Sequence, residues 1–130
     1  REFGMAFGTA YQIYDDCVDL FGTEKDAGKS LGTDLAKGKL TYPVLLAWER
    51  APAEERAQLE ALVSDWQPGS FGWVNQLLAR HETLKPTVAL IERYLVQARQ
   101  SLKSLPESVG RAGLQGVTDY LAQQTAALSE

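Results

Sequence analysis

Three aspartates interrupt an otherwise apolar stretch near the start of the chain, Tyr11-Gln12-Ile13-Tyr14-Asp15-Asp16-Cys17-Val18-Asp19-Leu20-Phe21-Gly22. The stretch predicts a helix, on which Asp15 and Asp19 lie one turn apart and Gln12 lies one turn before Asp16. Buried carboxylates are costly unless cations compensate them, and acids near the C-terminal end of a helix also oppose its dipole. Oxygen ligands of this kind suit a hard divalent cation such as Mg2+. Asp15, Asp16 and Asp19 are therefore candidate metal ligands.

The Asp-Asp-x-x-Asp spacing is short, and taken alone it fits a solvated helix face equally well. The segment that follows, residues 23–39, favours a site because it is polar and rich in glycine and lysine. Lysines beside an acidic metal site are expected where a metal and the lysines share one polyanion. As isolated residues they are surface charge, and that interpretation applies most strongly to Lys25 and Lys37.

Composition excludes several classes of protein. The chain has 130 residues, of which 45% are hydrophobic and 23% charged, as in ordinary globular domains. Its net charge of −4, without a basic stripe, argues against general nucleic-acid binding. No apolar run approaches the roughly 20 residues that span a bilayer. The lone Cys17 excludes an internal disulfide and fits a reducing compartment, so we expect a cytoplasmic protein.

Apolar periodicity predicts an all-α chain. Helices are expected at about 2–21, 40–50, 53–66, 71–81, 82–105 and 107–128. Gly22 ends the first of them, and a polar loop over residues 23–39 separates it from the second, for which Thr41 is the expected N-cap. We expect one all-α unit over residues 1–130 with about six helices. Because the chain starts at Arg1 without an initiator Met, we expect it to be part of a larger protein.

The motif helix and the loop behind it form one extended pattern. It comprises Tyr11 to Asp19, then Gly28-Lys29, Gly32-Thr33-Asp34-Leu35 and Gly38-Lys39-Leu40-Thr41-Tyr42-Pro43. This pattern resembles the second aspartate-rich region of the trans-type polyprenyl diphosphate synthases, although Tyr11 stands where Phe is common. The rest of the chain is similar to the C-terminal helices of that family only in a general way.

The resemblance implies a helical bundle of the isoprenoid synthase type and a specific chemistry. Such enzymes ionise an allylic diphosphate with the help of Mg2+; the double bond of isopentenyl diphosphate then attacks the allylic cation, and a proton is lost. By motif position, Asp15 would be the main metal ligand, supported by Asp16 and Asp19. The residues implied to contact the allylic diphosphate are Gln12, Lys29 and Lys39. Asp34 is expected to hold the loop or a lysine in place.

The family also has a first aspartate-rich motif and basic residues for isopentenyl diphosphate, both on earlier segments. No second Asp-Asp-x-x-Asp occurs in these 130 residues. We therefore expect this chain to supply half of the site and to be inactive alone, within an enzyme that is a homodimer or in association with an N-terminal part. A second hypothesis is a non-catalytic subunit or truncated module of a heteromeric synthase. A third is another diphosphate-ionising terpenoid enzyme, although Lys29 and Lys39 favour the chain-elongating branch.

Overall fold

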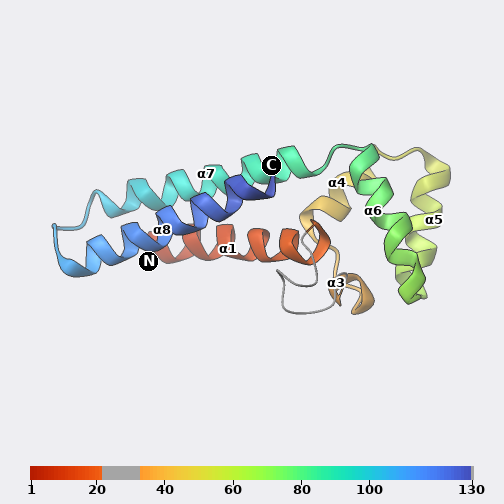
Figure 1. The fold of residues 1–130 in the computed structure, drawn as a ribbon, viewed down its shortest axis with the longest axis horizontal. Coiled ribbons are helices and arrows are strands. Elements are labelled where there is room, and N and C mark those ends of the chain that lie inside the picture. Colours follow the sequence, from red (N-terminus) through yellow and green to blue (C-terminus); the bar gives the residue numbers. More distant parts are fainter. Residues whose placement is uncertain (22–32, 130) are drawn as a thin grey trace. The chain divides into compact units, whose positions relative to one another are not determined.

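A computed structural model describes residues 1–21 and 33–129 (Figure 1). In this part of the chain every regular element is helical, which confirms the predicted all-α class. The elements are α1 (Glu2–Phe21), α3 (Thr33–Ala36), α4 (Tyr42–Arg50), α5 (Ala53–Ser64), the 3-10 turn η1 (Pro68–Ser70), α6 (Phe71–Arg80), α7 (Leu84–Leu102) and α8 (Val109–Leu128).

The six longer helices match the predicted ranges within a few residues at each end. The short helix α3 differs from the prediction, because it lies in the segment expected to be a loop. Four residues are too few for an apolar period to develop, so the pattern could not indicate it. Residues 22–32, which include the helix end expected at Gly22, lie outside the described residues.

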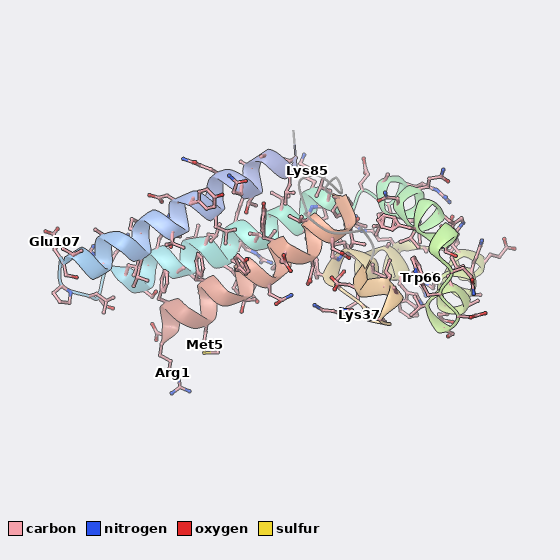
Figure 2. The ribbon with its side chains drawn as sticks, turned by 60° about the horizontal axis from the view of Figure 1, so that its bottom comes forward. Arg1, Met5, Lys37, Trp66, Lys85 and Glu107 are labelled. Atoms are coloured by element: carbon pink, nitrogen blue, oxygen red, sulfur yellow. The ribbon has the colours of Figure 1, made fainter. Side chains whose placement is uncertain are left out.

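Chain packing divides the protein into two compact units: a terminal unit of residues 1–14 and 88–130, and a central unit of residues 15–87. In the terminal unit, α7 and α8 form an antiparallel hairpin whose connection carries Glu107 (Figure 2). An ion pair between Arg99 Nη2 and Asp119 Oδ1, 3.2 Å apart, joins the two helices. The single domain expected from the sequence stays a prediction.

The core of the central unit gathers leucine, valine and alanine side chains from five helices. Its fully buried members are Leu20, Leu35, Val44, Ala47, Leu59, Val74, Leu77 and Leu78. Trp66, labelled in Figure 2, packs against them. Leu20 comes from the end of α1 and Leu35 from α3, so both sides of the aspartate-rich region are anchored in one core. Burial of this kind stabilises by about 1.5–3 kcal/mol for each large side chain.

Two backbone features set the helix ends of the central unit. Thr41 is the N-cap of α4, as predicted, but its side chain makes no capping hydrogen bond. Glu82, which follows α6, has a positive φ of 51°. The Glu82 and Thr83 N–H groups donate to the carbonyls of Ala79 and Leu78, which closes the end of α6 as a Schellman motif. Arg50 Nη1 donates to the Glu82 carbonyl, so α4 supports this turn.

Candidate functional site

The predicted metal ligands occupy the C-terminal half of α1 and differ in exposure. Asp15 is half-buried, Asp16 is 7% exposed and Asp19 is completely buried. Gln12 precedes Asp16 by one turn on the same helix and is exposed. Carboxylates that are removed from water in this way need cations or hydrogen-bond donors around them. The structure supplies different partners for Asp16 and Asp19.

Asp16 is paired with a lysine from beyond α3. Lys39 Nζ donates to Asp16 Oδ1 over 3.2 Å, and the Lys39 side chain remains half exposed. This hydrogen bond is the main cause that raises the pKa of Lys39, with the charges of Asp16, Asp34 and Asp15 acting in the same direction. Lys39 therefore carries its positive charge throughout the neutral range. The structure brings together Asp16 and Lys39, which the sequence had placed in one site.

Asp19 binds the backbone at the start of α3. Its Oδ2 accepts a hydrogen bond of 3.2 Å from the Asp34 N–H, at the start of α3. At the end of α3 the Lys39 N–H donates to the Asp34 carbonyl over 2.8 Å, and Gly38 takes a φ of 76°. That conformation favours glycine, and the two features together form a Schellman motif. The expectation that Asp34 holds the loop or a lysine in place stays a prediction, because these contacts are made by the Asp34 backbone.

Cys17 lies between the acids and is completely buried, without a disulfide partner in the part of the chain that the structure describes. Burial, followed by the charge of Asp16, raises the pKa of the Cys17 thiol to about 12. The thiol is therefore protonated near neutral pH and is a poor nucleophile. Cys17 contributes packing to the motif helix rather than chemistry.

The donor set fits a magnesium ion at Asp15 and Asp16, because both offer the hard oxygen ligands that this ion prefers. Across residues 1–21 and 33–129, no group of three or more acidic, histidine or cysteine side chains is already arranged to hold a metal. Asp19 has one oxygen engaged by backbone. Lys29, a predicted diphosphate contact, lies outside the described residues. The assignment of ligands therefore stays a prediction.

Two contacts in the central unit were missed by sequence reasoning. The first is the pairing of Asp19 with the Asp34 N–H. The sequence indicates only the ends of α3, because Asp34 comes early in Thr33-Asp34-Leu35-Ala36 and Gly38 follows; it does not indicate the pairing with Asp19. The second is Glu55, which bonds His81 Nε2 over 2.9 Å and also pairs with Arg80. That contact joins distant parts of the chain and has no local signal.

The all-α fold and the lysine bound to an Asp-rich helix are typical of enzymes that act on diphosphates. Comparison with known proteins identifies the family of this chain. Residues 1–79 match the family model of polyprenyl synthetases. The chain is 32% identical over 122 residues to heptaprenyl diphosphate synthase component 2 of Bacillus subtilis, covering 94% of this chain and 34% of that protein. The chain belongs to the polyprenyl synthetase family. This confirms the resemblance inferred from the motif.

Solved structures agree with this assignment. A polyprenyl synthase from Caulobacter crescentus, solved with calcium and isoprenyl diphosphate, matches with a TM-score of 0.83 and 28% identity. The match covers 94% of this chain and 38% of that one. A polyprenyl synthase from Roseobacter denitrificans matches with a TM-score of 0.81 and 30% identity, over 95% of this chain and 40% of that one. The isoprenoid synthase fold expected from the motif is therefore confirmed.

The chain spans about a third of the length of the curated relatives it matches. Within the described residues, no helix is both long enough and apolar enough to cross a membrane.

Proposed function

We propose that the protein carrying this chain is a prenyltransferase that condenses an allylic diphosphate with isopentenyl diphosphate. This chain would supply one half of its Mg2+ and diphosphate site. The observation that carries the proposal is the pairing of Lys39 with Asp16 at 3.2 Å, on the Asp-rich helix of a polyprenyl synthetase family member. A carboxylate that can hold a metal and a lysine that can bind phosphate suit the head group of such a substrate.

The proposed reaction breaks the bond between the allylic carbon and the diphosphate oxygen, and the electron pair leaves with the diphosphate. The double bond of isopentenyl diphosphate then forms the new carbon–carbon bond with the allylic cation, and a proton is lost from the isopentenyl unit. A Mg2+ ion bound through Asp15 and Asp16 would supply charge stabilisation for that leaving group. Lys39 donates to diphosphate oxygens while its contact with Asp16 keeps it in place. Gln12 would donate from the preceding turn of α1, and Lys29 would add a further cation.

We also propose that the protein is cytoplasmic and that the complete enzyme is a homodimer. The unpaired thiol of Cys17, observed within the described ranges, supports a reducing compartment. Exposed apolar side chains on α8 support self-association: Val109 is 91% exposed and Tyr120 63% exposed.

A second candidate function is that of one subunit in a heteromeric synthase. Two relatives carry names that favour it. One is the component 2 protein of Bacillus subtilis, and the other is decaprenyl-diphosphate synthase subunit 1 of Schizosaccharomyces pombe, which is 31% identical over 120 residues. In this case the Asp-rich helix would have the same role as in the first proposal, but turnover would require the partner polypeptide.

A labelled-substrate assay tests the proposal. The purified protein is incubated with farnesyl diphosphate and radiolabelled isopentenyl diphosphate, with Mg2+ or with a chelator. We expect label in a longer prenyl diphosphate only when Mg2+ is present. Product that forms only after a second polypeptide is added would favour the subunit function. If no product forms in either case, the proposed prenyl transfer is wrong.

A further inference from the structure

The third carboxylate of the motif has surroundings that differ from those of the first two. Asp19 is completely buried, whereas Asp15 is half-buried. Its Oδ2 accepts the Asp34 N–H over 3.2 Å. A buried carboxylate that accepts a backbone N–H satisfies a donor that would otherwise be costly to bury. This contact gives Asp19 a role that needs no metal.

The segment that Asp19 contacts, residues 34–39, is closed by backbone hydrogen bonds of its own. The Asp34 carbonyl accepts the Lys39 N–H over 2.8 Å, and the Leu35 carbonyl accepts the Gly38 N–H over 2.9 Å. Leu35 is 1% exposed and belongs to the core of the central unit. The positive φ of Gly38 lets the chain reverse there. The position of Asp34 therefore determines where the backbone of Lys39 lies.

The other end of this segment, Lys39, also contacts α1. Lys39 Nζ donates to Asp16 Oδ1 over 3.2 Å. Asp16 and Asp19 are three residues apart and share a face of α1. The two carboxylates thus hold the two ends of one segment: Asp19 binds its first N–H, and Asp16 binds its last side chain.

We propose that Asp19 is a positioning residue that fixes the segment Asp34–Lys39 and thereby aims Lys39 at the diphosphate site, rather than a ligand of the metal. The effect on substrate binding rests on the proposed prenyltransferase function. The hydrogen bond to Asp34 does not, and it can be measured without turnover.

Two substitutions of Asp19 separate the two roles. In Asp19→Asn the amide oxygen can still accept the Asp34 N–H, but the negative charge that favours a metal is lost. In Asp19→Ala both are lost. Asp15→Asn in the same protein provides the reference for damage to a metal ligand.

Amide hydrogen exchange at Asp34 gives the direct measurement. We expect Asp19→Ala to speed this exchange by about tenfold or more, the factor expected for loss of one hydrogen bond to a charged group. Asp19→Asn should retain most of the protection, and Asp15→Asn should leave it unchanged. If exchange at Asp34 is the same in wild type and Asp19→Ala, the proposal is overturned.

Kinetics of the protein that carries this chain give the second measurement. Asp19→Ala should raise the KM for the allylic diphosphate by about tenfold. The Mg2+ concentration for half-maximal rate should stay at the wild-type value in Asp19→Asn and should rise in Asp15→Asn. A rise in Asp19→Asn equal to that in Asp15→Asn would show that Asp19 is a ligand.

A double mutant of Asp19 and Lys39 tests whether Asp19 acts through Lys39. If Asp19 acts through Lys39, then adding Asp19→Ala to Lys39→Met should change KM by less than about twofold, although Asp19→Ala alone raises KM by about tenfold. Independent, multiplying effects would contradict the proposal. If Asp19→Ala does not fold, the Mg2+ dependence of Asp19→Asn decides. If the wild type shows no prenyl transfer, the proposed function fails, and exchange at Asp34 still decides the role of the hydrogen bond.

Discussion

At the scale of residues, the charge pair of Asp16 and Lys39 is a poor source of stability. The Lys39 side chain is half exposed, and exposed pairs typically contribute about 0–1 kcal/mol. The pair instead keeps a protonated ammonium beside the acids of α1. In the proposed function, a diphosphate that entered this site would meet a cation already held in position, which would reduce the entropy lost on binding.

Replacement of Lys39 tests that interpretation. We expect Lys39→Met to raise the KM for the allylic diphosphate by about 10–100-fold, because a charge-assisted contact of about 1.5–3 kcal/mol is lost. Helicity measured by circular dichroism should not change. Lys37→Met is the matched control, since Lys37 is exposed and lies in the same turn (Figure 2). Equal effects of the two substitutions would indicate general charge attraction instead of a defined contact.

At the scale of elements, two glycine-type turns end α3 and α6, but only one of them contains glycine. Gly38 has a φ of 76°, and Glu82 has a φ of 51°. A side chain in this conformation costs energy that glycine avoids. Both turns have the same pair of closing hydrogen bonds, so they form a natural comparison.

We expect Glu82→Gly to raise the free energy of unfolding by about 0.5–1 kcal/mol, because the strain of a non-glycine residue is removed. The support from Arg50 is retained, since Arg50 donates to the backbone carbonyl at this position. Urea denaturation of both proteins measures the difference. Gly38→Ala is the opposite control and should destabilise by about 1 kcal/mol or more. A Glu82→Gly variant less stable than wild type would refute this account of the turn.

Most of the longer helices could be predicted from the sequence because they carry a repeated apolar face that local periodicity reveals. The face of α5 is the weakest, since Leu59 is its one buried side chain. The candidate site was predictable only in part. The order of Asp15, Asp16, Asp19 and Lys39 along the chain indicated a metal and diphosphate site. The partner of Asp19 depends on α3 folding back onto α1, and no pattern within either segment specifies that contact.

At the scale of the whole molecule, the 130 residues contain one aspartate-rich motif, whereas the resemblance implies two. We therefore expect the 130-residue chain alone to give no condensation product in the labelled assay. The protein that carries it, or its mixture with the partner that completes it, should be active. Sustained turnover by the 130-residue chain would contradict the view that it supplies half of the site.

The most direct test of the Asp-rich helix as a metal and diphosphate site is the condensation rate of Asp15→Asn in the protein that carries this chain. We expect a loss of about 10²–10³-fold in kcat, the effect of removing one group that stabilises developing charge, with unchanged helicity. Glu92→Gln, which alters an exposed carboxylate on α7, should retain the wild-type rate. A wild-type rate in Asp15→Asn at limiting Mg2+ would show that the Asp-rich helix is not the metal and diphosphate site.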